Sequence, residues 1–175
     1  MHFSTRLAEE TDEFKIYNLY KQVAKIPGGI AREEDEITPA YVSNNLRKSL
    51  QNGLSLVIAN PENPAELVAE MHGYQLEPRV FKHILSELTI VVHPGFQNCG
   101  LGKRLFLDFL KYVEENRPDV LRVELIARES NTRAIAFYQK IGFVVEGRLE
   151  KRIDTKTGSF EADIPMAWFN RNFVK

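Results

Sequence analysis

Residues 86–111 read SELTIVVHPGFQNCGLGKRLFLDFLK, and this stretch decides the fold of the chain. It contains an apolar strand, a loop with glycines and a helix, in immediate succession. Leu101, Leu105 and Phe109 recur at the spacing of one helical face. A loop that leads directly into a helix start presents backbone N–H groups and the positive end of the helix dipole. The stretch therefore predicts a pocket for a phosphate or pyrophosphate.

Strands and helices are predicted on both sides of this stretch from apolar periodicity and from turn residues. We expect strands at 2–6, 54–59, 66–74, 81–92, 120–127, 143–153 and 160–169. We expect helices at 9–24, 40–51, 101–115 and 131–140, with stops at 27–29 and 52–53, a Thr38-Pro39 start before the second helix and a turn at 155–159. The order β α α β β β α β α β β mixes antiparallel hairpins with a strand–helix–strand crossover, so it indicates an α/β fold with a mixed sheet.

The composition is that of one ordinary globular domain. The chain has 175 residues and a mass of 20.1 kDa, which fits a single domain over residues 1–175. Hydrophobic residues make up 43% and charged residues 27%, too apolar for a disordered chain. The formal net charge of -1 supplies no global field for nucleic acid or for an acidic membrane surface. We expect neither as a partner.

Cysteine and histidine usage argues against disulfides and metals. Cys99 is the single cysteine, which excludes an intrachain disulfide framework and suits a reducing compartment. His72, His83 and His93 lack the spacing of metal ligands, so no metal is expected. No run of about 18 apolar residues occurs, and MHFSTRLAEETDEF lacks the apolar core of a secretion signal. We expect a cytoplasmic protein, for which a homodimer is compatible with the sequence.

The loop at Gln97–Gly102 has two glycines spaced by one residue at the mouth of the helix. Glycine lets the backbone approach a ligand without a Cβ in the way. The Gly-Lys-Ser/Thr ending of a Walker loop is absent, and Leu105 stands where the dinucleotide fingerprint has its third glycine. A short pyrophosphate-binding loop remains, and the alternative is a plain turn into a helix.

Two motifs carry a family resemblance. Val92-His93-Pro94 followed by Gln97–Gly102 resembles motif A of the GNAT family, the acetyl-CoA-dependent N-acetyltransferases. Residues 131–143 resemble its motif B, Asn-x-x-Ala-x-x-(Leu/Phe)-Tyr-x-x-x-Gly-Phe. The resemblance covers about residues 54–169 and implies the GNAT acyl-CoA N-acyltransferase fold.

The resemblance also implies which residues bind acetyl-CoA. The backbone of the strand ending at Val92 would bind the pantetheine arm, and loop N–H groups would bind the pyrophosphate. Asn131 and Tyr138 would lie near the pantetheine and the reacting sulfur, and Asn131 is in addition a good helix cap. The implied cofactor-binding residues are Ile90, Val91, Val92, Gln97, Asn98, Cys99, Gly100, Leu101, Gly102, Lys103, Asn131 and Tyr138.

Acetyl transfer to an amine needs a polarised thioester and a proton for the departing thiolate. By resemblance, a backbone N–H near Val92 helps to polarise the carbonyl. Tyr138 is the candidate general acid, because a phenol is still protonated at neutral pH. Glu87 and Glu124 are the candidate general bases, and the alternatives are solvated or ion-paired carboxylates and a base that is water alone.

The acidic loop before the second helix is the candidate acceptor-binding region. Glu33, Glu34 and Glu36 would attract a cationic amine, whereas the alternative is a solvated loop. The sequence thus predicts an acyltransferase that moves an acetyl group from acetyl-CoA to a primary amine by direct transfer in a ternary complex. A non-catalytic acyl-CoA-binding or sensor domain of the same fold is the alternative, followed by a nucleotide-binding interaction module.

Overall fold

The computed structural model describes residues 2–26, 29–155 and 157–175. The chain forms two compact units. Unit 1 consists of Met1–Gln75 and Leu88–Tyr112, and unit 2 of Leu76–Glu87 and Val113–Lys175. A single domain over residues 1–175 stays a prediction. The predicted stop at Pro27-Gly28 and Lys156 of the predicted turn lie outside the described residues.

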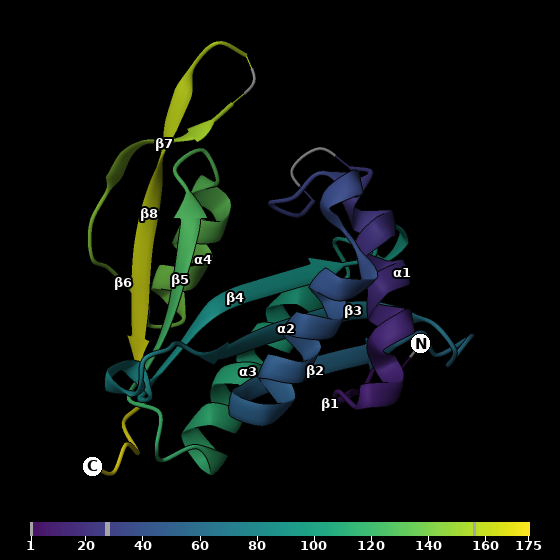
Figure 1. Cartoon of the computed structure of the whole chain (residues 1–175), viewed down its shortest axis with the longest axis horizontal. Coiled ribbons are helices and arrows are strands. Elements are labelled where there is room, and N and C mark those ends of the chain that lie inside the picture. The colour runs from purple at the N-terminus through teal and green to yellow at the C-terminus, as the bar shows by residue number, and fades with distance from the viewer. Residues whose placement is uncertain (1, 27–28, 156) are drawn as a thin grey trace. The chain divides into compact units, whose positions relative to one another are not determined.

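Strands and helices follow one another in a mixed α/β order, as predicted (Figure 1). The strands are β1 (Thr5–Leu7), β2 (Gly53–Ala59), β3 (Leu67–Gln75), β4 (Ile84–Val92), β5 (Arg122–Arg128), β6 (Val144–Val145), β7 (Leu149–Asp154) and β8 (Phe160–Phe169). The α-helices are α1 (Glu13–Ala24), α2 (Pro39–Asn52), α3 (Leu101–Asn116) and α4 (Thr132–Lys140). Short 3-10 turns are η1 (Glu10–Asp12), η2 (Glu34–Glu36), η3 (Arg79–Phe81) and η4 (Pro94–Phe96). Among the described residues, no helix is both long and apolar enough to cross a membrane.

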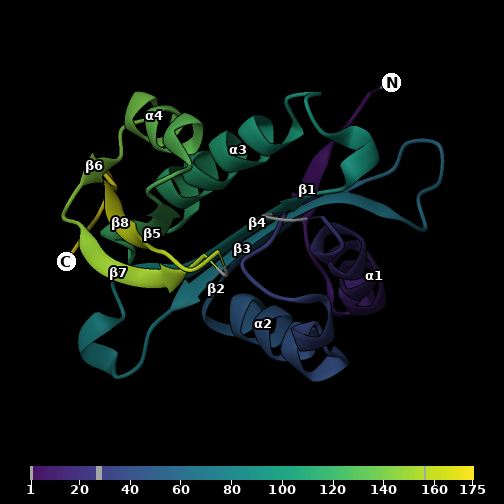
Figure 2. The same cartoon turned by 90° about the horizontal axis from the view of Figure 1, so that it is seen from above.

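Unit 1 contains a sheet in the order β1-β2-β3-β4, to which β4 contributes residues 88–92, with helices on both faces. Strands β2 and β3 form the predicted antiparallel hairpin, in which Leu54 lies opposite Gly73. Figure 2 shows α1 and α2 on one face of this sheet and α3 on the other. The apolar stripe of α1 packs with α2 and the sheet in one buried cluster, which includes Ile16, Tyr20 and Val42. The 3.6-residue spacing of the stripe therefore sets which face of α1 is covered.

Helix α2 begins and ends within one residue of the predicted bounds, at the predicted start and stop signals. Thr38 Oγ1 accepts the Tyr41 N–H at 3.1 Å, and Pro39 occupies the first helical position. The helix ends at Asn52, and β2 begins at Gly53. A Cβ at position 53 would collide with the Gly73 carbonyl oxygen on β3, so only glycine allows the helix to pass directly into the strand.

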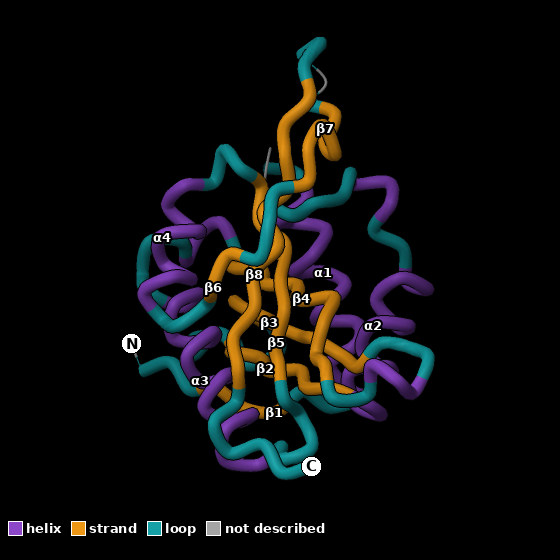
Figure 3. Tube along the Cα trace, turned by 90° about the vertical axis from the view of Figure 1, so that its left-hand side faces the viewer, coloured by secondary structure: helices purple, strands orange, loops and turns teal. Residues whose placement is uncertain are grey.

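Unit 2 is built around β8, which pairs antiparallel with β5 along the whole of β5. The predicted strand 143–153 is wrong as one element, because it is divided into β6 and β7, which both pair with β8. Gly147 lies in the break, and Lys151 in β7 has a left-handed φ of 52° where the register shifts. Figure 3 shows the β7–β8 hairpin extending beyond the end of β5.

Strand β4 begins later than predicted. Residues 79–81 form η3, and β4 begins at Ile84 instead of Phe81. Within unit 2, β4 pairs in parallel with β5 at Ile84 opposite Arg122 and Leu85 opposite Val123. The crossover through α3 gives this parallel contact, as the mixed-sheet prediction requires.

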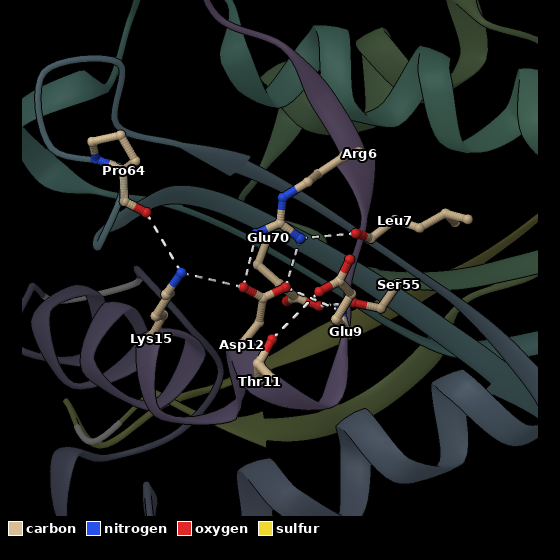
Figure 4. Close-up of polar contacts among 9 residues, drawn as sticks. All are labelled: Arg6, Leu7, Glu9, Thr11, Asp12, Lys15, Ser55, Pro64 and Glu70. Carbon is tan, nitrogen blue, oxygen red and sulfur yellow. Dashed lines mark hydrogen bonds and ion pairs between the residues drawn. The ribbon is translucent and has the colours of Figure 1, made fainter.

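A buried carboxylate fixes the start of α1 to β1 (Figure 4). Asp12, with 1% of its surface exposed, accepts hydrogen bonds from Arg6 at 2.6 and 2.8 Å and from the Glu9 N–H at 3.0 Å. Lys15 Nζ lies 3.8 Å from Asp12 Oδ1. Burial raises the pKa of Asp12, but the hydrogen bonds and charges of Arg6, Glu9 and Lys15 outweigh it, and the pKa is lowered overall.

The lowered pKa makes the contribution of Asp12 to stability dependent on pH. A carboxyl whose pKa is lower in the folded chain stabilises it above its unfolded pKa, and this stability is lost as the pH falls through the folded pKa. We expect Asp12→Asn to reduce the free energy of unfolding by about 2 kcal/mol at pH 7. Urea unfolding should show a difference between variant and wild type that shrinks in acid. A difference that is independent of pH would contradict the assignment.

Candidate functional site

The loop between β4 and α3 turns through two residues with left-handed backbone conformation. After η4, Asn98 has φ 61° and Gly100 has φ 76°. Asparagine and glycine tolerate this conformation best. His93 fixes the beginning of the loop, because its Nδ1 accepts the Gly95 N–H at 3.1 Å. The loop therefore has a defined path to the first residue of α3.

The start of α3 presents backbone donors to the loop. The Arg104 N–H donates to the Gly100 carbonyl at 3.0 Å, which is the first hydrogen bond of the helix. The N–H groups of Leu101, Gly102 and Lys103 precede it, so helix geometry gives them no acceptor within α3. Together with the helix dipole they favour an anion, and the Lys103 side chain is exposed at the same turn.

The two loop glycines have different surroundings. A Cβ built on Gly100 meets no atom within 4 Å, and one on Gly102 would lie 3.5 Å from Val92 Cγ2 and 4.0 Å from Ile90 Cδ1. The fold itself leaves room for a side chain at both positions, although the φ of Gly100 would strain it. The open space beside the N–H groups is what a pyrophosphate group needs, so these residues fit such a ligand.

The apolar end of strand β4 is only partly covered. Val91 is buried, whereas Ile90 and Val92 are partly buried. Glu87 is exposed and has a left-handed φ of 55°, which is unusual for a residue with a side chain. Strained residues of this kind occur preferentially at functional sites.

Helix α4 carries the two motif B candidates in unit 2. Asn131 Oδ1 accepts the Ala134 N–H at 3.2 Å, so Asn131 is the helix cap that its residue type predicted. The helix ends before Gly142, whose φ is 102° and whose Cβ position lies 3.4 Å from Trp168 Cδ1. These contacts set both ends of α4.

Tyr138 is half-buried on α4 between two aromatic rings. Its ring centroid lies 5.7 Å from that of Phe137 and 5.9 Å from that of Phe143. Burial raises the pKa of the Tyr138 phenol above its ordinary value. The phenol is therefore fully protonated at neutral pH, which is the state that a general acid requires.

Glu124 is part of an ion-paired group on the sheet of unit 2. Its carboxylate lies 2.9 Å from Arg122, which also contacts Glu146 at 2.6 Å and the Phe169 ring at 5.6 Å. The Glu124 carboxylate is therefore already engaged in an ion pair. Within unit 2, Glu87 is the candidate base with the more exposed side chain.

The family follows from comparison with known proteins. A sequence model of the Acetyltransferase (GNAT) family matches residues 16–143, which is most of the chain. The chain belongs to the GNAT family. Among curated proteins, the UPF0157 protein YqkA of Bacillus subtilis is 33% identical over 61 residues, which span 35% of this chain and 17% of YqkA.

Solved structures show the same fold. A GNAT acetyltransferase from Streptococcus pneumoniae has a TM-score of 0.82 and 21% identity, with 96% of this chain and 99% of that chain covered. YncA from Salmonella typhimurium, solved with its cofactor acetyl-CoA, has a TM-score of 0.76 and 16% identity, with 95% and 93% covered. The predicted GNAT fold is thereby confirmed.

In this GNAT chain the acidic loop is an ordered 3-10 turn. Glu36 accepts the Glu33 N–H at 2.7 Å, and the Glu34 carboxylate lies 3.6 Å from Lys21. The Lys21 ammonium also donates to the Glu34 carbonyl at 2.8 Å. These carboxylates have structural partners, so acceptor binding by Glu33, Glu34 and Glu36 stays a prediction.

The loop and motif B candidates lie in different units. Unit 1 brings together the loop residues 97–103 and the end of β4, and unit 2 contains Asn131, Tyr138, Glu87 and Glu124. Each group has the local geometry described above. Their roles in this GNAT chain stay predictions.

Unit 1 of the GNAT fold contains a buried polar cluster that was not predicted from the sequence. Glu70 accepts hydrogen bonds from Tyr20 at 2.6 Å and from Ser55 at 2.9 Å, and His72 Nδ1 lies 3.1 Å from the same carboxylate. All four side chains are at least 97% buried. Burial, followed by the negative charge of Glu70, raises the pKa of Tyr20 well above its ordinary value. The signal was present as polar residues at alternate positions of β3.

Proposed function

We propose that this chain transfers an acetyl group from acetyl-CoA to a primary amine, by direct transfer in a ternary complex. The observation that carries the proposal is the loop of residues 97–103, which combines free space at Gly100 with the donors at the start of α3. The family match supports the reaction class, and the acetyl-CoA bound to YncA supports the donor. Cys99 as a single cysteine is consistent with the proposed cytoplasmic location.

Different segments of the proposed cofactor site bind different parts of acetyl-CoA. Backbone N–H groups of residues 98–103 hold the pyrophosphate, with Gln97 and Cys99 in the same loop. The backbone of Ile90, Val91 and Val92 binds the pantetheine arm. Asn131 contributes its side-chain NH₂ group, because its capping bond uses only Oδ1. Bound acetyl-CoA supplies the activated acetyl group.

The proposed reaction forms one bond, breaks one bond and transfers two protons. The neutral amine nitrogen attacks the thioester carbonyl, a C–N bond forms and the C–S bond breaks. Tyr138 donates its phenolic proton to the departing thiolate, and Glu87, Glu124 or water takes the proton of the attacking amine. The phenolate of Tyr138 then regains a proton from solvent.

An amine panel with a matched pair of glycine variants tests the proposal. Thiol release from acetyl-CoA is measured with polyamines, amino acids, lysine peptides, peptide N-termini and aminoglycosides, with a control that lacks amine. We expect release that depends on one class of amine. Gly100→Ala should raise the KM for acetyl-CoA about tenfold, since it strains the loop and fills the space beside the donors.

Gly158→Ala is the matched control, because Gly158 has a φ of 84° and also meets no atom within 4 Å of its Cβ position. Its strain is comparable, but it lies in the β7–β8 turn. Equal effects of the two variants would remove the loop as the cofactor site. Binding of acetyl-CoA without turnover on any amine would refute the transferase and favour the sensor.

A further inference from the structure

A cavity of about 310 Å³ lies in unit 1 between helix α1 and the start of β3. The α1 wall includes the apolar Leu19 and the polar side chains of Lys15, Asn18, Lys21, Gln22 and, at the C-cap of the helix, Lys25. Residues 65–67 and His93 form the other walls. The volume falls within the range of small-molecule sites, about 300–1,000 Å³.

The cavity has an excess of positive charge. Its lining contains three lysines and one carboxylate, that of Glu66. Glu66 Oε2 accepts a hydrogen bond from Asn60 Nδ2 at 3.3 Å, so part of its acceptor capacity is used. The lining itself has an excess of two positive charges, which the neighbouring carboxylates of Asp12 and Glu34 offset in part, and this excess favours an anionic ligand.

Two of the lysines are held in place by neighbouring groups. Lys15 Nζ donates to the Pro64 carbonyl at 3.5 Å and lies 3.8 Å from Asp12 (Figure 4). Asp12 is bonded more closely to Arg6, at 2.6 Å, which neutralises much of its charge. Lys21 is held by Glu34. Because an ammonium group has three donors, each of these lysines keeps donor capacity for a ligand.

Gln22 adds a neutral donor, oriented by His93. The Gly95 N–H donates to His93 Nδ1, so this nitrogen acts as an acceptor. His93 Nε2–H therefore donates to Gln22 Oε1 at 3.0 Å. Gln22 accordingly presents its NH₂ group, which is a pure donor, and the polar lining is richer in donors than in acceptors.

We infer that this cavity, named here the α1 cavity, binds a small multivalent anion that carries phosphate or carboxylate groups. Fixed ammonium groups and amide donors around a cavity of small-molecule size are the chemistry that recognises such a ligand. The α1 cavity is distinct from the anion-binding start of α3, because α1 and α3 lie on opposite faces of the unit 1 sheet (Figure 2).

Calorimetric titration with citrate and with pyrophosphate, each with and without saturating CoA, tests the inference. We expect at least one of the two anions to bind, more weakly as NaCl is raised. We expect the binding to persist with CoA present, since CoA is proposed to occupy the α3 loop. Binding of citrate alone would assign carboxylates as the ligand class, and binding of pyrophosphate alone would assign phosphates.

Lysine variants locate the binding. Lys15→Gln combined with Lys25→Gln should weaken the anion about tenfold, and Lys25→Gln alone about threefold. Lys48→Gln on α2 makes the same charge change away from the cavity and should have no effect. The single variant keeps the test valid if loss of the Lys15–Asp12 contact reduces stability.

Three outcomes would overturn the inference. They are no binding of either anion, binding that CoA abolishes, and binding that is equal in wild type and in both cavity variants. The amine assay is independent of all three, so failure of this inference and failure of the proposed transferase are distinguishable.

Discussion

Tyr138→Phe is expected to lower kcat about a hundredfold and to leave the affinity for acetyl-CoA nearly unchanged. The variant removes only the hydroxyl group, and the ring keeps its contacts with Phe137 and Phe143. Without the phenolic proton, the thiolate must leave without a general acid. Steady-state kinetics for kcat, together with equilibrium titration of acetyl-CoA, separate the two effects.

The pH dependence provides a second readout for Tyr138. Because burial raises the pKa of its phenol, the wild-type rate should lose the acid only in strongly alkaline solution. Tyr17→Phe is a matched control, as Tyr17 is also a partly buried helical tyrosine with an aromatic neighbour, Phe14. An unchanged kcat in Tyr138→Phe would remove this residue as the acid.

Glu70→Ala is expected to reduce the free energy of unfolding by about 3–5 kcal/mol. The substitution leaves a cavity and removes the shared acceptor of Tyr20 and Ser55, and it takes away the carboxylate beside His72. A buried donor that loses its acceptor makes no hydrogen bond in the folded chain, whereas water would accept its hydrogen bond in the unfolded chain. This difference destabilises the folded chain. Chemical unfolding measures the difference.

Two further variants serve as controls for Glu70→Ala. Glu62→Ala removes an exposed carboxylate in the turn before β3 and should change stability by less than about 0.5 kcal/mol. Glu70→Gln keeps the size of the side chain and should cost less than Glu70→Ala. A loss below about 1 kcal/mol in Glu70→Ala would show that the cluster contributes little to folding.

The order of elements was predictable because local signals decide it. Thr38 and Pro39 specify the start of α2 by themselves, and Gly53 ends it for a steric reason. The break between β6 and β7 was not predicted, although Gly147 interrupts the alternation of apolar residues at this point. Pairing with β8 makes the break, and such pairing is long-range in sequence.

The parts of the candidate site that depend on backbone conformation were predictable, because sequence motifs specify the local backbone. The loop at Gly100 and the capping role of Asn131 follow from residue type and spacing. The ion pair of Glu124 with Arg122 and the buried state of Glu70 do not, because they depend on which surfaces cover these strands. A two-residue period of apolar and polar side chains shows which residues share a face of a strand, but it does not show which element covers that face.

The fluorescence of Trp168 can test whether the two units unfold together. It is the one tryptophan of the chain, and it packs beside Gly142 in unit 2. Its fluorescence reports the unfolding of unit 2 without a label, whereas far-ultraviolet circular dichroism averages over the helices of both units. Coincident transitions are the mark of one cooperative domain, and separate midpoints would assign a stability to each unit.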